Sequence, residues 1–205
     1  MNKTNLDNLH HLKVFNNHLD SEFCKHLIYK FESDKRVKPG STGYGYDKEM
    51  KDSLDLHIHY KTMPDWRNEV NYLHKQLHAS LKEYLELHYF PYAKGLYNPY
   101  DSGFQIQKSS EGQKHSYDWH SDECYDILND KEIGYRIVTF LWYLNTVEAG
   151  GETVFYDGTK ITPESGKLIL FPSTWDYNHK GCSPILGDKY ICTGWFYNCY
   201  KDTKT

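Results

Sequence analysis

The sequence lacks the features that mark membrane-spanning, secreted and nucleic-acid-binding proteins. None of its apolar runs approaches the roughly 18 residues that a membrane-spanning helix needs. The first seven residues are polar and include no apolar segment of the kind that forms a secretory signal. Acidic residues outnumber basic residues, 28 to 24. We therefore expect neither a membrane nor a nucleic-acid backbone as the main partner of this chain.

The sequence also lacks a cysteine pattern. The five cysteines are an odd number and include no C-x-x-C pair. A disulfide framework or a zinc ribbon is therefore not expected, and a reducing, cytoplasmic compartment fits better. The sequence has no internal repeat and no low-complexity linker, and its 205 residues suit one domain with a sizeable core. We predict a single domain over residues 1–205.

The first part of the chain has a helical pattern. Asp20 or Ser21 can cap a helix whose apolar residues fall at positions 23, 27, 28 and 31. Three glycines and a proline between residues 38 and 46 predict a loop. Alternating residues then predict a strand over 54–58, and an apolar stripe predicts a long helix over 65–88.

After about residue 95 the pattern becomes that of a β protein. Predicted strands cover residues 104–107, 135–144, 153–155, 167–171 and 190–196. Several short strands separated by Gly and Pro turns are typical of a sandwich or barrel. Helices that precede the strands, and do not alternate with them, argue against a parallel doubly wound sheet. The prediction is a mainly β fold, with helical support over about 1–95 and a β core over about 96–200.

Three side chains can form a metal site. His120 and Asp122 are two residues apart, so on a strand they point to the same side. His179 follows a predicted strand and the Pro172-Ser173 turn, and it is the best candidate for a third ligand. Two imidazoles and one carboxylate leave coordination positions open, which suits iron(II) better than a closed structural zinc site.

The same pattern can arise by chance, because the chain contains 12 histidines. Two of them, His57 and His59, also share one face of a predicted strand. Another, His115, lies close to His120 in the sequence. We interpret His57, His59 and His115 as surface or edge histidines.

A lysine strengthens the argument for a binding pocket. Lys189, Thr193 and Trp195 share one face of a predicted strand, and Thr139 and Tyr143 share a face of the long strand before it. A cation inside a β core is costly unless an anion pairs with it. The distal carboxylate of 2-oxoglutarate would be such an anion, and Thr193 could donate a hydrogen bond to it. Taken alone, Lys189 could equally be a solvated lysine at the entrance of a strand.

Together, these motifs occur in an order that resembles a known family. The order is His120-Ser121-Asp122, Tyr143-Leu144-Asn145, Gly150-Gly151-Glu152-Thr153, His179, and Lys189 to Trp195. This order is similar to that of 2-oxoglutarate- and iron(II)-dependent dioxygenases of the prolyl 4-hydroxylase type. The resemblance covers most of residues 104–196.

The resemblance implies a double-stranded β-helix (jelly-roll) core and a set of site residues. His120, Asp122 and His179 would bind Fe(II), and Lys189 would bind the distal carboxylate of 2-oxoglutarate. Four further residues, less directly matched, would lie near this co-substrate: Tyr143, Thr193, Thr139 and Trp195. Dioxygen would be the second co-substrate, with ascorbate as an accessory reductant.

The implied reaction is hydroxylation of an unactivated C–H bond, most simply in a prolyl residue of a peptide or protein. Two alternatives stay open. The substrate could be a free amino acid or another small metabolite, or the chain could be a jelly-roll module that binds a metal or metabolite without turnover. Asp122 is intact, which disfavours the halogenase variant of the family, in which a small residue stands at this position.

One departure from the family pattern stands out. Many members have a tyrosine where this chain has Ser109, and Gln107 or another group would have to replace its contact. We also form the hypothesis that the loop over residues 38–50 closes over the site, because it is rich in Gly and Tyr. A passive surface loop is the alternative.

Overall fold

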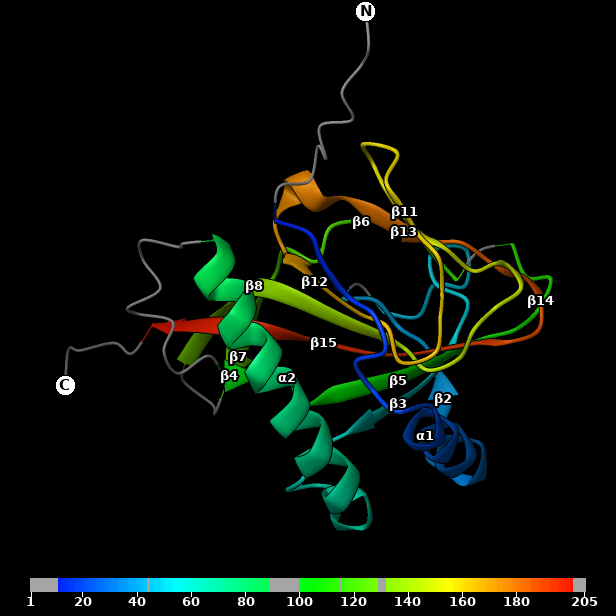
Figure 1. The fold of residues 1–205 in the computed structure, drawn as a ribbon, viewed down its shortest axis with the longest axis horizontal. Coiled ribbons are helices and arrows are strands. Elements are labelled where there is room, and N and C mark those ends of the chain that lie inside the picture. Colours follow the sequence, from blue (N-terminus) through cyan, green and yellow to red (C-terminus); the bar gives the residue numbers. More distant parts are fainter. Residues whose placement is uncertain (1–10, 44, 89–99, 115, 129–131, 201–205) are drawn as a thin grey trace, which may run out of the picture.

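Two larger β-sheets, a two-stranded β-pair and two α-helices form the fold of the described residues (Figure 1). The structure is a computed structural model, and it describes residues 11–43, 45–88, 100–114, 116–128 and 132–200. A main sheet lies in the middle of the molecule, with helices α1 (Ser21–Ser33) and α2 (Arg67–His88) against one face and a smaller sheet against the other. This is the arrangement expected of a jelly-roll core with supporting helices, so the predicted fold class is confirmed.

The main sheet contains nine strands. Its hydrogen-bonded order is β1 (Lys13–Phe15), β12 (Leu168–Pro172), β8 (Glu132–Tyr143), β15 (Lys189–Tyr200), β5 (Phe104–Ser109), β3 (Leu54–Ile58) and β2 (Lys38–Pro39). Two short strands pair at its sides, β4 (Tyr100–Asp101) with β15 and β7 (Tyr125–Leu128) with β8. Strands β1, β2 and β3 come from the first part of the chain, so that part supplies strands to the sheet as well as helices.

The smaller sheet carries part of the candidate site. Its order is β11 (Lys160–Ile161), β10 (Thr153–Phe155), β13 (His179–Gly181) and β6 (Tyr117–His120). A separate pair joins β14 (Pro184–Leu186) to β9 (Ala149–Gly150). Two 3-10 turns complete the described elements, η1 (Pro64–Trp66) before α2 and η3 (Trp175–Tyr177) before β13.

Strand β8 shows how the main sheet separates two cores. Phe140 and Trp142 pack into the cluster that includes the buried side chains of α1 and α2. Leu141 and Tyr143 point to the opposite face and pack into a second cluster under the smaller sheet. Because successive residues of a strand point to opposite faces, one nearly continuous apolar run fills both cores.

The first helix follows its sequence signals. The Asp20 side chain accepts a hydrogen bond of 2.9 Å from the backbone N–H of Glu22, so it caps α1 as predicted. Leu27 and Phe31 are fully buried against the sheet. Gly166 fixes the approach to this helix, because its φ of +79° is left-handed and a Cβ there would lie 2.1 Å from the carbonyl oxygen of Leu19.

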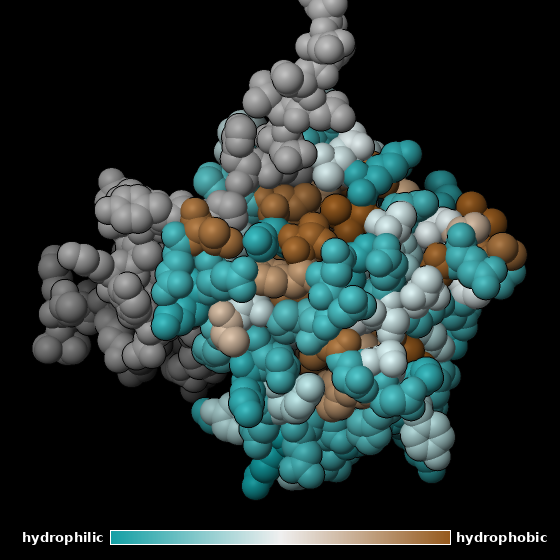
Figure 2. Space-filling view, viewed as in Figure 1, coloured by the Kyte–Doolittle hydropathy of each residue, from teal (hydrophilic) through white to brown (hydrophobic). Residues whose placement is uncertain are grey.

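The surface seen in Figure 2 is mostly hydrophilic, with apolar residues gathered in the upper centre of the view. No helix within the described residues is long and apolar enough to cross a membrane. Four cysteines of the described part, Cys24, Cys124, Cys182 and Cys192, carry free thiols.

Candidate metal centre and its pocket

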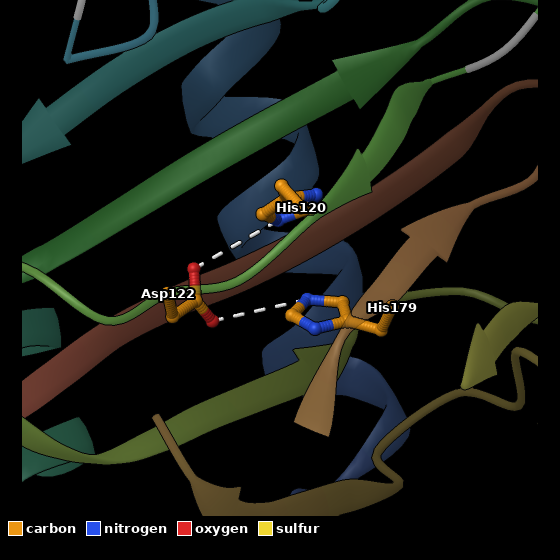
Figure 3. A group of neighbouring side chains, drawn as sticks. All are labelled: His120, Asp122 and His179. Carbon is orange, nitrogen blue, oxygen red and sulfur yellow. Dashed lines mark ion pairs between the residues drawn. The ribbon is translucent and has the colours of Figure 1, made fainter. Parts of the chain in front are cut away.

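The three predicted metal ligands come together between the two sheets (Figure 3). His120 ends β6 and His179 begins β13, and the two residues lie directly opposite each other in the antiparallel pair. Asp122 lies two residues beyond the end of β6, so it reaches the site from the segment after the strand and not from the strand itself. Its two carboxylate oxygens each lie 3.8 Å from one Nε2 atom, Oδ1 from that of His120 and Oδ2 from that of His179.

Backbone carbonyls fix which nitrogen of each imidazole faces the centre. Nδ1 of His120 lies 2.7 Å from the carbonyl oxygen of Asp118, and Nδ1 of His179 lies 2.9 Å from that of Tyr177. A carbonyl only accepts hydrogen bonds, so each Nδ1 must carry the proton. Each Nε2 is then left with a lone pair directed toward Asp122. Such outer hydrogen bonds are the usual way in which proteins orient metal-binding histidines.

The protonation states favour a cation at this centre. Burial, followed by the nearby His179, lowers the pKa of His120, so this imidazole is neutral near pH 7. Burial alone would raise the pKa of Asp122, but His179, His120 and a hydrogen bond from Thr139 lower it overall. The carboxylate is therefore ionised.

Two lone pairs and a carboxylate thus face one another without a hydrogen atom between them. Their ligand atoms all lie within 4.8 Å of one another. This arrangement is repulsive unless a cation occupies the centre, and a set of two imidazoles and one carboxylate suits iron(II). The donor set therefore fits the predicted metal.

Thr139 has a role other than the predicted contact with the co-substrate. Its hydroxyl donates a hydrogen bond of 2.8 Å to Oδ2 of Asp122. Oγ of Ser173 lies 3.0 Å from Oγ1 of Thr139, and Ser173 must be the donor there, since the single hydroxyl proton of Thr139 goes to Asp122. Thr139 therefore holds the acidic ligand in place, although it also lines the pocket.

A pocket extends from the metal ligands. Eight of the nine side chains that the sequence predicted for the site line it, and the exception is Tyr143. The hydroxyl of Tyr143 donates a hydrogen bond of 2.6 Å to Oγ1 of Thr153, and Thr153 lines the pocket in its place. Tyr143 itself is fully buried in the cluster behind it.

Lys189 is the cation of this pocket. Its side chain is 3% exposed, and its Nζ donates to the carbonyl oxygens of Gly151 at 3.1 Å and Cys182 at 3.3 Å. Burial lowers the pKa of Lys189 to about 8. Among the described residues, Lys189 therefore forms hydrogen bonds only with neutral backbone carbonyls. A buried ammonium without an acidic partner is complementary to a carboxylate of a ligand.

Two other predicted residues lie close to Lys189 in the sequence and line the same pocket. The hydroxyl of Thr193 donates a hydrogen bond of 2.7 Å to the carbonyl oxygen of Phe140, so a hydrogen bond to a bound carboxylate would require this hydroxyl to rotate. The indole Nε1 of Trp195 is buried and has no hydrogen-bond partner among the described residues. The guanidinium of Arg136 lies 3.6 Å from the centre of the Trp195 ring.

Sequence reasoning missed Tyr117, which also lines the pocket. Its ring stacks on the imidazole of His120, with centroids 3.6 Å apart and planes 14° apart. Burial raises the pKa of Tyr117 to about 12. Strand parity would place residues 117 and 120 on opposite faces. However, Tyr117 pairs with Gly181 while His120 pairs with His179, so β6 has one extra residue and the parity changes.

The remaining predictions lie around this site. Ser109 is 4% exposed and faces the pocket opposite Lys189 in the β5–β15 pair, so a small hydroxyl stands where the family resemblance led us to expect a tyrosine. His57 lies 3.2 Å from the carbonyl oxygen of Ser102 and is outside the metal cluster that the described residues form. His59 is also outside the metal cluster, and His115 lies outside the described residues.

Comparison with known proteins identifies the family. The model of the 2OG-Fe(II) oxygenase superfamily matches residues 104–197, which include all three candidate ligands and Lys189. Residues 104–197 belong to the 2OG-Fe(II) oxygenase superfamily. The oxygenase domain also has curated relatives in Arabidopsis thaliana. Prolyl 4-hydroxylase 13 is 36% identical over 119 residues, which cover 47% of this chain and 43% of that protein. Probable prolyl 4-hydroxylase 3 is 28% identical over 211 residues, which cover 90% and 68%.

Solved structures share the fold of the oxygenase domain. A prolyl hydroxylase from Trichoplax adhaerens, in complex with a peptide fragment of the hypoxia inducible factor oxygen degradation domain, has a TM-score of 0.66 and 18% identity, covering 91% of this chain and 83% of that one. A viral collagen prolyl hydroxylase from Paramecium Bursaria Chlorella virus-1, in a 2OG complex, has a TM-score of 0.63 and 19% identity, covering 91% and 96%. The resemblance to prolyl 4-hydroxylases that the motifs indicated is confirmed.

Proposed function

We propose that this chain is an Fe(II)- and 2-oxoglutarate-dependent dioxygenase that hydroxylates a prolyl residue of a peptide or protein. The observation that supports it most strongly is the pairing, in one pocket, of the His120, Asp122 and His179 cluster with a buried lysine whose hydrogen-bond acceptors among the described residues are backbone carbonyls. The reaction converts the substrate C–H, dioxygen and 2-oxoglutarate to the alcohol, succinate and carbon dioxide. The relatives named prolyl 4-hydroxylase support the choice of substrate.

The side chains of the chain would divide the work. His120, Asp122 and His179 would hold iron(II), which together with 2-oxoglutarate supplies the oxidising power for attack on the C–H bond. Lys189 would anchor the distal carboxylate and so fix the co-substrate in one orientation. Thr139 keeps the Asp122 carboxylate in place through its 2.8 Å hydrogen bond. Leu141 and Ile191 line the same pocket and help to exclude water.

The lining of the pocket offers a hydrogen-bond donor for a substrate. The buried indole N–H of Trp195 has no acceptor among the described residues, and the guanidinium of Arg136 lies over the same ring. A donor of this kind fits a carbonyl oxygen, and a peptide presents many of them. We keep the predicted lid role of residues 38–50 as part of this proposal.

A turnover screen tests the proposed function. Full-length protein is incubated in air with iron(II), 2-oxoglutarate, and a panel of proline-containing peptides and free amino acids, with and without ascorbate. We expect one added oxygen in a peptide, in step with succinate formation, and longer-lasting activity with ascorbate. Oxygen added only to a free amino acid or another metabolite would replace the proposed substrate class. Succinate formation no faster than in the His179→Ala variant would favour a binding module.

A further inference from the structure

A buried ion pair lies outside the metal centre. Nζ of Lys51 lies 2.7 Å from Oδ2 of Asp55, and each side chain is 3% exposed. Oδ1 of Asp55 also accepts a hydrogen bond of 2.8 Å from the hydroxyl of Ser53. Gly40 packs closely over this group, because a Cβ there would lie 2.3 Å from Oγ of Ser53. A buried ion pair is costly to desolvate, and an apolar replacement is often as stable, so stability alone does not account for it.

Asp55 is connected to the pocket through two glutamines. Its Oδ2 accepts a hydrogen bond of 3.1 Å from Nε2 of Gln105. The Oε1 of Gln105 in turn accepts a hydrogen bond of 2.7 Å from Nε2 of Gln107, and Gln107 lines the pocket. Strand β3 supplies Asp55 and its neighbour β5 supplies both glutamines.

The carboxylate sets the direction of this whole chain of hydrogen bonds. When paired with Lys51, Asp55 has no proton to donate, so Gln105 must present its amide nitrogen to it. The oxygen of Gln105 then faces Gln107, which must present its own nitrogen. This leaves Oε1 of Gln107 as a hydrogen-bond acceptor that has no partner among the described residues.

An acceptor at this position selects the group that binds beside it. Both carboxylates of 2-oxoglutarate are acceptors, so neither forms a hydrogen bond with a carbonyl oxygen. An N–H group does. From the sequence, Gln107 was expected to replace the contact that the family tyrosine makes with the co-substrate. That contact would require a hydrogen-bond donor, whereas Gln107 turns its amide oxygen, an acceptor, toward the pocket.

We propose that Lys51 and Asp55 are positioning residues that hold the Gln107 side-chain amide with its oxygen toward the pocket, where it accepts a hydrogen bond from an N–H group of the primary substrate. This inference rests on the proposed function for the identity of the substrate. Its first part, the orientation of Gln107, does not depend on turnover.

The orientation can be measured directly by NMR on the full-length protein without metal. Scalar couplings across hydrogen bonds join the donor nitrogen to the carbonyl or carboxylate carbon of its acceptor, so they identify which side chain donates to which. We expect couplings from Nε2 of Gln107 to Cδ of Gln105 and from Nε2 of Gln105 to Cγ of Asp55. A coupling in the reverse sense would overturn the inference. So would the absence of both where backbone couplings between β3 and β5 are seen.

The second part is tested by binding and kinetics, using the proline-containing peptide that gives the most product in the screen. In Gln107→Met we expect the KM for this peptide to rise about 10-fold, as for loss of one hydrogen bond. We expect the affinity for 2-oxoglutarate, measured without oxygen, to stay within twofold. A loss of 2-oxoglutarate affinity of tenfold or more would show that Gln107 contacts the co-substrate, against the inference.

A double variant tests whether the ion pair acts through Gln107. Lys51→Met with Asp55→Asn removes both charges together, so no unpaired buried charge remains. We expect a smaller rise in peptide KM than in Gln107→Met, and no further rise when the two changes are combined, because both affect one contact. Independent, multiplying effects on KM would overturn the positioning role.

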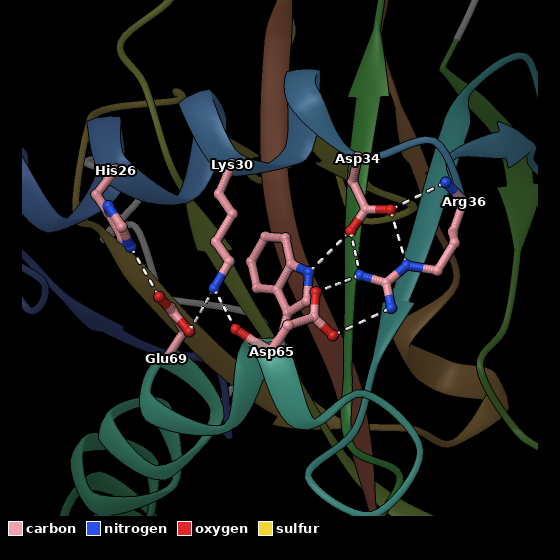
Figure 4. A network of polar contacts seen from close by, with 7 residues as sticks. His26, Lys30, Asp34, Arg36, Asp65 and Glu69 are labelled. Atoms are coloured by element: carbon pink, nitrogen blue, oxygen red, sulfur yellow. Dashed lines mark hydrogen bonds and ion pairs between the residues drawn. The ribbon is translucent and has the colours of Figure 1, made fainter.

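The control is a second, less deeply buried ion pair, in the polar network between α1 and α2 (Figure 4). Nζ of Lys30 lies 2.9 Å from Oε2 of Glu69, and their side chains are 26% and 10% exposed. This pair lies on the helical side of the main sheet, opposite the pocket. Lys30→Met with Glu69→Gln is expected to lower stability and leave the peptide KM unchanged. If wild-type protein fails to bind 2-oxoglutarate or to turn over, the proposed function fails, and the NMR result still decides the orientation of Gln107.

Discussion

Without co-substrate, the Lys189→Met variant should become less stable relative to the wild type as the pH rises. The same substitution should weaken co-substrate binding. Burial lowers the pKa of Lys189 from 10.5 to about 8 in the folded protein. Between these two values the unfolded chain holds the proton and the folded chain does not. The free energy of unfolding contributed by Lys189 therefore rises with pH across this window. The full shift corresponds to about 3 kcal/mol.

The assay is urea unfolding of wild type and Lys189→Met at several pH values, without metal or 2-oxoglutarate. The absolute difference at neutral pH also includes the lost hydrogen bonds to Gly151 and Cys182, so the slope is the cleaner quantity. We expect the free energy of unfolding of the wild type to rise relative to that of the variant by about 1 kcal/mol per pH unit on average between pH 8 and 10.

Lys108→Met is the control for this slope. Lys108 forms ion pairs with Glu32 at 2.9 Å and Asp188 at 3.1 Å, and hydrogen bonds to Glu32 and Tyr190 raise its pKa although burial opposes this. It stays protonated in both states over this range, so its difference from wild type should be flat. A flat difference for Lys189→Met as well would refute the reasoning. Lys189→Met should also weaken 2-oxoglutarate binding about 100-fold or more.

Three further changes test the ligand support and the fold. Burial lowers the pKa of His18, whose Nδ1 accepts a 3.0 Å hydrogen bond from Trp142. Wild type should therefore lose stability relative to His18→Gln as the pH falls below 6.5. Urea unfolding that shows the same pH dependence of the free energy of unfolding for both proteins would contradict this. Thr139→Val removes the 2.8 Å hydrogen bond to Asp122 and should weaken iron(II) binding about 10- to 100-fold in an anaerobic titration, whereas unchanged affinity would deny it a supporting role. Gly166→Ala places a Cβ 2.1 Å from a carbonyl oxygen at a φ of +79°, so it should lower the free energy of unfolding by more than about 2 kcal/mol, and a stable variant would show that this turn can rearrange.

The parts of the site that could be predicted depend on local pattern and motif order. His120 and Asp122 are only two positions apart in the sequence. The register of β6 and β13 then brings His179 directly opposite His120. The alternation along β8 also follows from sequence, since Phe140 and Leu141 face different cores. This alternation along β8 depends on the two-residue period of a strand, which a sequence displays directly.

The parts that could not be predicted depend on irregular pairing and on contacts between distant strands. One extra residue in β6 turns Tyr117 to the pocket side, where strict parity would place it on the other side. The link from Asp55 to Gln105 joins residues 50 positions apart, and it exists only because β3 pairs with β5. Thr139 was placed on the right face, but its hydrogen bond to Asp122 required the structure.

The central claim is that His120, Asp122 and His179 hold iron(II) beside a 2-oxoglutarate site at Lys189. It is tested most directly by adding iron(II) and then 2-oxoglutarate to the full-length protein without oxygen and recording visible absorption. The account predicts a charge-transfer band in wild type and in the control His57→Ala, no band in His179→Ala, and a band in Lys189→Met only at much higher 2-oxoglutarate concentration. Wild-type protein that is folded and gives no band would contradict it.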